Sequence, residues 1–445
     1  MKPSSADNAL QDRSASQQGL LRRFVLLEPN ELKPAVLSAA YFFFLLSSYF
    51  VMRPIREEMG VAGGVRNLPW LFMGTMIAMV VASQFFAVLA SRTPRWRFIP
   101  LAYRFCIVNL LVFFFLFHLV DGEWKIHLGR AFYIWVSVFN LFVVSIFWSL
   151  MADCFNSGQA KRLFGLIAVG GTAGAISGSA ITGLLVGWLG VPVLLLVAMV
   201  LLELGTQCAK RLMRPTGNDG AQVSMTPLPT PEPGPGVFAG LTLISRSIYL
   251  QGICVHMLIY TITSTLLYFE QARIVEAFSA DPNVRIPVFA GINIAENTLT
   301  ILMQFFLTAR IVKRAGIGLT LAIIPSLTML GFLAMAYAPP GMWLLIVLIA
   351  FQSLRRAVHF AVSRPTREML YTVLGADEKY KSKNFIDTAV YRAGDVVGAG
   401  TYKAIVAASG GLAAVAVPLC ALWVCVSVFL GARQRKLAQA ADQSR

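Results

Sequence analysis

The chain has 445 residues, of which 57% are hydrophobic and only 13% are charged, and its mean hydropathy is +0.67. A soluble globular chain carries about 25% charged residues, so this composition excludes an ordinary soluble domain and indicates a membrane protein. The formal net charge of +16 is also found in nucleic-acid-binding proteins, but here the positions of the basic residues give another reason for it.

Twelve apolar stretches are long enough to cross a bilayer core of about 30 Å as helices. They cover residues 34–52, 69–90, 99–119, 131–151, 163–187, 191–208, 248–269, 286–309, 317–337, 342–359, 385–408 and 411–430. The pattern predicts an all-α membrane protein with twelve transmembrane helices in two six-helix halves, 34–208 and 248–430. The other segments are predicted as an N-terminal tail (1–33), a proline- and glycine-rich linker (209–247) and a C-terminal tail (431–445).

Lysine and arginine residues gather on one side of this topology. With the N-terminus inside, the predicted cytoplasmic segments hold 28 of them and the outer loops hold seven. This asymmetry follows the positive-inside rule, so we expect a bacterial inner-membrane protein with both termini in the cytoplasm. The basic balance then reflects topology, and we expect membrane lipids around a monomeric chain and no nucleic-acid partner.

Charged residues stand at the end of the first predicted helix. If this helix continues through Pro54, then Tyr49, Arg53 and Arg56 share one face, at positions i, i+4 and i+7. Two interpretations stay open: a cap at the outer membrane interface, or the cationic face of a central cavity that binds an anion.

The fifth predicted helix is rich in glycine. Gly170, Gly174 and Gly178 form a stripe that lets a neighbouring helix backbone approach closely. No Lys-Ser/Thr pair follows and no strand precedes it, so this is not a phosphate-binding loop. Gly174 and Gly178 recur at a constant offset as Gly394 and Gly398 in the eleventh helix, which favours a parallel repeat of two six-helix units.

Glu296 is a candidate functional carboxylate near the middle of the eighth predicted helix. It stands beside a stripe of amide and hydroxyl side chains on the same helix. A carboxylate at this depth is costly in lipid and therefore faces protein or water. We expect either a residue that couples transport to a proton or ion, or a hydrogen-bonded packing residue.

The stretch 364–400 begins as a charged segment and leads into the eleventh helix. Lys381 and Lys383 precede this helix, and Asp387, Arg392 and Asp395 lie within it. Ionisable groups in a membrane span commonly mark a substrate or proton path. Arg392 and Asp395 are also spaced to neutralise each other at i, i+3, and the two interpretations are compatible.

Three further charged residues lie at predicted helix ends and are candidates for coupling or gating. Asp153 closes the fourth helix on the cytoplasmic side, and Glu270 and Arg273 end the seventh helix. The last two occupy the place in the second half that Arg53 and Arg56 occupy in the first.

No catalytic or metal-binding constellation appears in the sequence. The six cysteines lack CxxC or metal-ligand spacing, and the four histidines are dispersed. There is no Walker lysine, HExxH or GxSxG motif. We therefore expect no enzyme activity, metal or cofactor, and any transport would draw its energy from a gradient or from exchange.

Twelve predicted helices, a central linker and basic loops resemble the major facilitator superfamily. A closer resemblance is to the ATP:ADP antiporter family, the nucleotide transporters of plastids and intracellular bacteria. It rests on residues 53–57 (RPIRE), 147–148 (FW), 159–166 (QAKRLFGL), 367–371 (REMLY) and 381–387 (KSKNFID). The resemblance implies that Arg56, Lys381 and Lys383 handle nucleotide phosphates, which suits clustered Lys and Arg.

Together these observations predict a secondary transporter that moves a phosphorylated, nucleotide-like small anion by alternating access of two six-helix halves. Tyr49, Arg53, Arg56 and Arg392 would bind the anion, and Glu296, Asp387 or Asp395 would carry a proton or switch an ion pair. Two alternatives stay open. One is a proton-coupled exporter or flippase of an amphipathic or lipid-linked anion, and the other is a membrane receptor that transports nothing.

Overall fold

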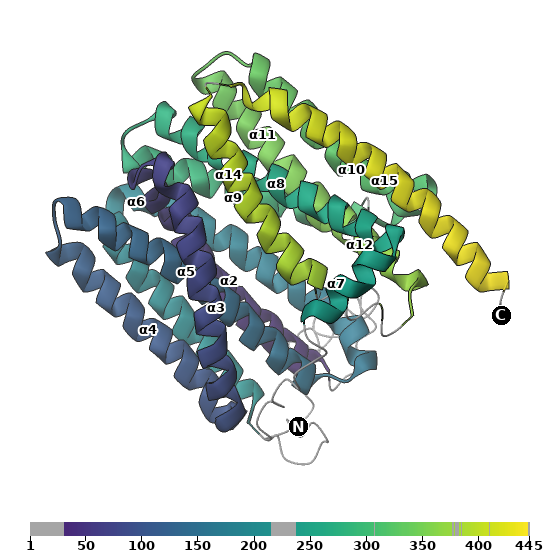
Figure 1. Cartoon of the computed structure of the whole chain (residues 1–445). Coiled ribbons are helices and arrows are strands. Elements are labelled where there is room, and N and C mark those ends of the chain that lie inside the picture. The colour runs from purple at the N-terminus through teal and green to yellow at the C-terminus, as the bar shows by residue number, and fades with distance from the viewer. Residues whose placement is uncertain are drawn as a thin grey trace, which may run out of the picture.

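The computed structural model describes residues 31–214, 237–306, 308–375, 378, 382–383, 385–408 and 410–443. Within these ranges the chain is built of helices and contains no strand. The longer helices are α2 (Leu32–Ala62), α3 (Leu68–Arg92), α4 (Arg95–Leu119), α5 (Glu123–Cys154), α6 (Ser157–Leu212), α7 (Val237–Arg246), α8 (Ile248–Phe278), α9 (Pro282–Phe306), α10 (Thr308–Tyr337), α11 (Met342–Val358), α12 (Arg364–Leu370), α14 (Tyr391–Ala407) and α15 (Leu412–Gln443). Figure 1 shows α2 to α6 in one bundle and α8 to α15 in a second bundle beside it.

Ten helical segments of the described residues are long and apolar enough to cross a membrane. One of them, Arg162–Leu212, spans two predicted helices and is broken at Gly190, where φ is +72°. That left-handed conformation favours glycine, and Pro192 just beyond it opens the next helix. The eleventh predicted helix is a short π-helix, η4 (Ile386–Val390), continued by α14. The twelve predicted spans therefore fit the observed fold.

Several predicted boundaries are wrong because helices continue past them. α2 runs through Pro54 to Ala62, although a proline inside a helix removes one backbone hydrogen bond and its ring crowds the carbonyl one turn earlier. α11 continues through the π-helix η2 (His359–Ser363) into α12, with Pro365 at a first-turn position that it tolerates. The charged segment predicted after 359 is thus helical at its start.

The predicted linker and C-terminal tail also contain helix. The last part of the linker forms α7, and residues 215–236 lie outside the described residues. α15 runs to Gln443 because its final turns, KLAQAADQ, consist mostly of strong helix formers.

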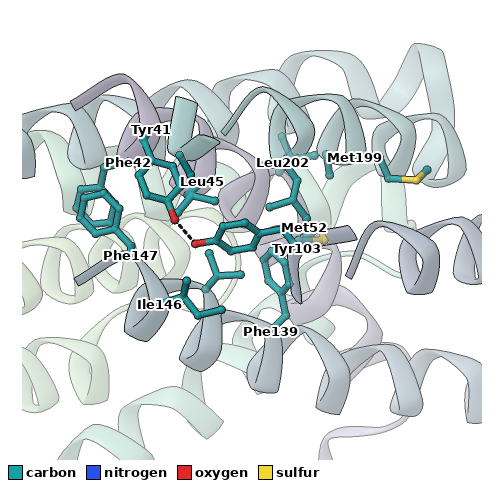
Figure 2. Packing of buried hydrophobic residues seen from close by; sticks show 14 of the residues in the cluster. Tyr41, Phe42, Leu45, Met52, Tyr103, Phe139, Ile146, Phe147, Met199 and Leu202 are labelled. Carbon is teal, nitrogen blue, oxygen red and sulfur yellow. Dashed lines mark hydrogen bonds between the residues drawn. The ribbon is translucent and has the colours of Figure 1, made fainter. Parts of the chain in front are cut away.

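The first half packs around a buried aromatic core. Figure 2 shows Tyr41 and Tyr103 joined by a hydrogen bond between their hydroxyl groups. Phe147 stacks on Phe42 with ring centroids 4.1 Å apart. The hydrogen bond satisfies two polar groups that would otherwise be costly to bury, so this half has a fixed internal packing.

A second core joins the two halves. Buried side chains from α3 and α5 (Leu68, Leu71, Tyr133) pack with Leu266, Phe269 and Phe289 from α8 and α9. These residues lie at what we call the distal end, the end of the bundle where α2, α8 and α14 end. α3 also contacts α14 across the halves, and α6 contacts α9. In Figure 1, α3 and α14 lie close at this end and diverge away from it.

The glycine stripe of α6 lies directly against α2. A Cβ atom at Gly170, Gly174 or Gly178 would overlap the backbone of Ala39, Phe43 or Ser47. The two rows advance together by four residues, so the helix backbones touch over two turns.

The repeated glycines make the equivalent contact in the second half. A Cβ at Gly394 would overlap the Thr261 side chain, and one at Gly398 would come within 2.9 Å of Cβ of Thr265, both on α8. The fifth and first helices of one half therefore pack like the eleventh and seventh of the other, as a six-helix repeat requires.

Candidate functional site

Glu296 of α9 lies between arginines from both halves. Its Oε2 is 3.7 Å from a guanidinium nitrogen of Arg53 on α2, and its Oε1 is 3.3 Å from Nε of Arg356 on α11. The glutamate side chain is only 6% exposed. One carboxylate between two guanidinium groups leaves this three-residue cluster with a formal charge of +1, which an anion would offset.

Arg56 anchors a polar chain that crosses from one half to the other. Its guanidinium is 2.7 Å from Oε1 of Glu57, donates from Nε to Ser137 Oγ at 2.9 Å and lies 4.0 Å above the Tyr133 ring. The Tyr268 hydroxyl on α8 donates to Oε2 of Glu57 at 2.5 Å. It also shares a hydrogen bond of 2.8 Å with the Tyr133 hydroxyl.

A third link, between Glu58 of α2 and Arg285 of α9, is buried more deeply. Their charged atoms are 2.6 Å apart, and the side chains are 2% and 9% exposed. Within the part of the chain that the structure describes, Oε2 of Glu58 and Nε of Arg285 have no hydrogen-bond partner. Both charges have therefore lost their water, and the hydrogen bonds they form do not replace all of it. Removing either partner would leave the other charge buried and unpaired, which is strongly destabilising.

A cavity of about 330 Å³ lies between α3 and α14, with α2 and α5 at its base. Its described charged lining residues are four cations, Arg56, Arg66, Arg392 and Lys403, and one carboxylate, Asp395. The rest of the wall is mostly apolar, with Trp70, Phe72, Met73, Met76, Met79, Val396 and Ala399 among its residues. An apolar cavity with a few convergent cations is suited to an organic anion.

Arg392 and Asp395 form the ion pair that their spacing predicts, at 3.4 Å. Thr265 Oγ1 donates to the same carboxylate at 3.2 Å, and Arg392 also lies 3.4 Å from the sulfur of Met79 in the first half. The arginine side chain is nevertheless 45% exposed. Neutralisation by Asp395 is thus compatible with an additional anionic contact to the guanidinium.

The structure brings Arg56 and Arg392 to one cavity but leaves other predicted residues elsewhere. Arg53 is engaged with Glu296, and neither it nor half-buried Tyr49 is among the described lining residues. Lys381 lies outside the described residues.

Before the start of α14, charged residues pair with one another at the end of the bundle opposite to the distal end. Asp387 is 3.2 Å from Arg367. Lys383 is 2.5 Å from Glu368, which also lies 3.6 Å from Arg367. The described residues of this charged segment therefore form ion pairs that link α12 to the residues at the start of η4.

Of the remaining candidates, Glu270 and Arg273 do not end their helix as predicted, because α8 continues past them to Phe278. Glu270 pairs with Arg273 one turn later, and the Tyr402 hydroxyl donates to the same glutamate at 3.3 Å. Asp153 lies half-buried in the last turn of α5.

Sequence reasoning missed Arg355, which lies four residues before the end of the predicted span 342–359. The residue is 3% exposed, donating from Nε to Thr328 at 3.1 Å and from a terminal nitrogen to Ser264 at 2.8 Å and Thr263 at 3.3 Å. The sequence did indicate that the helix continues past Arg355, because no helix-breaking residue stands between it and Pro365. The pairing of Glu58 with Arg285 carried no such local signal.

No family model matches the sequence, and no curated protein matches it. Solved structures do match. A bacterial homologue of the iron transporter ferroportin, in an inward-facing state, has a TM-score of 0.63 at 10% identity, over 91% of this chain and 100% of that one. A POT-family peptide transporter in complex with sulfate has a TM-score of 0.61 at 12% identity, over 90% and 95%. The nucleoside transporter NupG has a TM-score of 0.52 at 13% identity, over 92% and 99%.

At these identities the likeness shows the fold and nothing finer. The chain is a multi-pass, all-helical membrane protein with the fold of the major facilitator transporters. The resemblance to the ATP:ADP antiporter family stays a prediction. The fold and the cavity between the halves are the two observations that bear on its function.

Proposed function

We propose that this chain is a secondary transporter that moves a phosphorylated, nucleotide-like anion across the bacterial inner membrane by alternating access. One observation carries the proposal: Arg56 from the first half and Arg392 from the second line the same cavity. A charged ligand held between two halves that move relative to each other is exposed to each side of the membrane in turn.

The contacts between the halves support the alternating part of the mechanism. Polar links at Tyr268 and Arg285 lie toward the distal end, as does the shared apolar core, and the link at Glu296 lies near the middle of α9. If the termini are cytoplasmic, this is the outer side, and in the described conformation the two halves are joined to each other there. Transport then requires these links to break and an equivalent closure to form at the other end.

Each candidate residue has a role in this mechanism. Arg56 and Arg392 neutralise the anion, because guanidinium groups bind phosphate oxygens by charge-assisted hydrogen bonds. Glu296 exchanges partners between Arg53, Arg356 and a proton as the halves move. Asp395 competes with the anion for Arg392. When the anion leaves, Arg392 forms its ion pair with Asp395 again.

Further charged residues act at the two mouths of the path. Lys381, Lys383 and Asp387 attract and release the anion on the cytoplasmic side, where Asp153 also lies. Glu270 and Arg273 act on the outer side. These assignments follow the predicted topology, with both termini in the cytoplasm.

The test is uptake of labelled ATP and ADP into proteoliposomes, with and without unlabelled nucleotide inside. Preloading should accelerate uptake if the chain exchanges nucleotides. Arg392→Gln should raise the apparent KM about tenfold or more, since a hydrogen bond to a charged group contributes about 1.5–3 kcal/mol.

Arg104→Gln is the matched control for this variant. Arg104 is also a half-exposed helical arginine with a carboxylate, Glu203, at 3.4 Å, but it lies outside the cavity. Unchanged uptake in Arg392→Gln, or an equal loss in Arg104→Gln, would remove the cavity from the mechanism.

A further inference from the structure

The wall of the cavity between α3 and α14 opens toward the surroundings of the protein. Three of its lining residues are strongly exposed: Trp70 at 63%, Met73 at 40% and Val396 at 44%. Exposed apolar side chains on transmembrane helices face lipid or an open path between the halves. A cavity walled by such residues can therefore be entered from within the membrane.

The cavity extends from one membrane interface to about the bilayer midplane. Trp70 and Met79 are nine residues apart on α3, which corresponds to about 14 Å at 1.5 Å per residue. This is close to half of a hydrocarbon core of about 30 Å. At the shallow end the Lys403 amine lies 5.7 Å above the Trp70 ring, a pair typical of the interface.

An apolar track leads away from the cavity along α3. Met73, Ile77 and Val80 share one helical face at i, i+4 and i+7, and all three are at least 40% exposed. The first of them is also a cavity wall residue. A ligand with its charged group in the cavity would thus find continuous apolar surface for a chain.

The charges of the lining select the head group. Arg56 of the first half and Arg392 of the second half both line the cavity, and the described lining holds four cations against one carboxylate, Asp395. A volume of about 330 Å³ is at the small end of ligand pockets, so it holds a head group while a chain stays outside.

We infer that the cavity binds an anionic single-chain amphiphile, a phosphate head group on an acyl chain, which enters sideways from the bilayer between α3 and α14. The inference rests on the proposed function, because it uses the same cavity and the same two arginines. It keeps the phosphorylated anion of that proposal and replaces the nucleotide part with an acyl chain. The phosphate lies between Arg56 and Arg392, and the chain passes Met73 toward Ile77.

The experiment measures ligand-dependent thermal unfolding of the full-length chain in a neutral detergent. Lysophosphatidic acid is the probe, because it combines a phosphate with one acyl chain. Lysophosphatidylcholine carries the same chain without net charge, glycerol 3-phosphate carries the phosphate without a chain, and ATP is the nucleotide. Apparent Kd values follow from the shift of the unfolding midpoint with ligand concentration.

Gly400→Leu blocks the cavity with little risk to the fold. Gly400 lines the cavity on α14, and a Cβ placed there meets no atom of the described residues within 4 Å. Leucine also favours a helix more than glycine does. Gly187→Leu is the matched control, since Gly187 is another exposed helical glycine with open space around it, on α6 and outside the cavity.

We expect lysophosphatidic acid to bind at least tenfold more tightly than the other three probes. Gly400→Leu and Arg392→Gln should each weaken this binding about tenfold or more, whereas Gly187→Leu and Arg104→Gln should leave it within twofold. If Gly400→Leu fails to fold, the binding measured for Arg392→Gln still tests the inference.

Three results would overturn the inference, and they separate it from the proposed function. Binding of ATP with no preference for the lipid would leave the proposed function standing alone. Equal binding of the two lysolipids, unaffected by the variants, would mean non-specific lipid contact. If the folded chain bound no anion at all, both the inferred lipid binding and the proposed anion site would be refuted.

Discussion

The buried pair of Glu58 and Arg285 should hold the distal end closed, and Glu58→Gln should open it. In the closed state this change leaves the Arg285 cation 9% exposed without its carboxylate. Removing one partner of a buried ion pair costs about 3–5 kcal/mol. When the halves separate at this end, both groups meet water, so the cost falls on the closed state. A change of about 3 kcal/mol shifts the equilibrium toward the open state about a hundredfold.

The assay is labelling of a cysteine at position 71 by a membrane-impermeant maleimide added from the outside. Leu71 is 5% exposed and packs in the core between the halves, so Leu71→Cys reacts only when the distal end opens. The chain without the added cysteine gives the background from its six native cysteines. Glu58→Gln in the Leu71→Cys chain should raise the labelling rate substantially.

Two further variants decide whether the ion pair is the cause. Adding Arg285→Gln to Glu58→Gln removes the stranded charge, so the double variant should label more slowly than Glu58→Gln alone. Glu203→Gln breaks the exposed pair with Arg104, whose side chains are 36% and 53% exposed, and should change nothing. If Glu58→Gln labels no faster than Glu203→Gln, or the double variant labels fastest, the reasoning is wrong.

Three other outcomes follow from the described contacts. Tyr268→Phe removes the hydroxyl that bonds Glu57, a loss of about 1.5–3 kcal/mol from the closed state, so Leu71→Cys should label about tenfold faster. Gly174→Leu forces a side chain into the backbone of α2 and should lower the thermal midpoint of the purified chain by several degrees. Gly165→Leu, where nothing lies within 4 Å of the new Cβ, should not lower it. Glu296→Gln leaves two arginines around a neutral side chain, so anion exchange by reconstituted chain should slow at least tenfold, and normal exchange would remove Glu296 from the mechanism.

The helices were largely predictable because length and apolar composition determine what crosses a bilayer. The break at Gly190 lies within the predicted gap between the fifth and sixth spans. Helix ends were less predictable, since Pro54 and Pro365 are both accommodated inside or at the start of helices. A proline in a first turn or beside the end of a span does not have to stop a helix.

The candidate site was predictable only in part. Arg392 stands out because charged residues in apolar helices are rare and costly, whereas Arg56 was indicated by its helical spacing from Tyr49 and Arg53. Their common cavity depends on how α3 packs against α14, and no pattern within either helix encodes that contact. Met73 and Met76 of α3 look like ordinary lipid-facing residues in the sequence and line the cavity in the structure.

Buried charges form different kinds of contact within one half and between the two halves, and the difference fits the movement expected of the halves. Arg355 donates to Thr328, Thr263 and Ser264, all within the second half, so this charge can stay buried while that half moves as a unit. The links between the halves instead use whole ion pairs, such as Glu58 with Arg285. Apolar residues of similar volume would often close this end at least as firmly. Ionic groups differ in that water solvates them well when they separate, which lowers the free energy of the open state. Ion pairs at the closure therefore keep the two states close in energy, as alternating access requires.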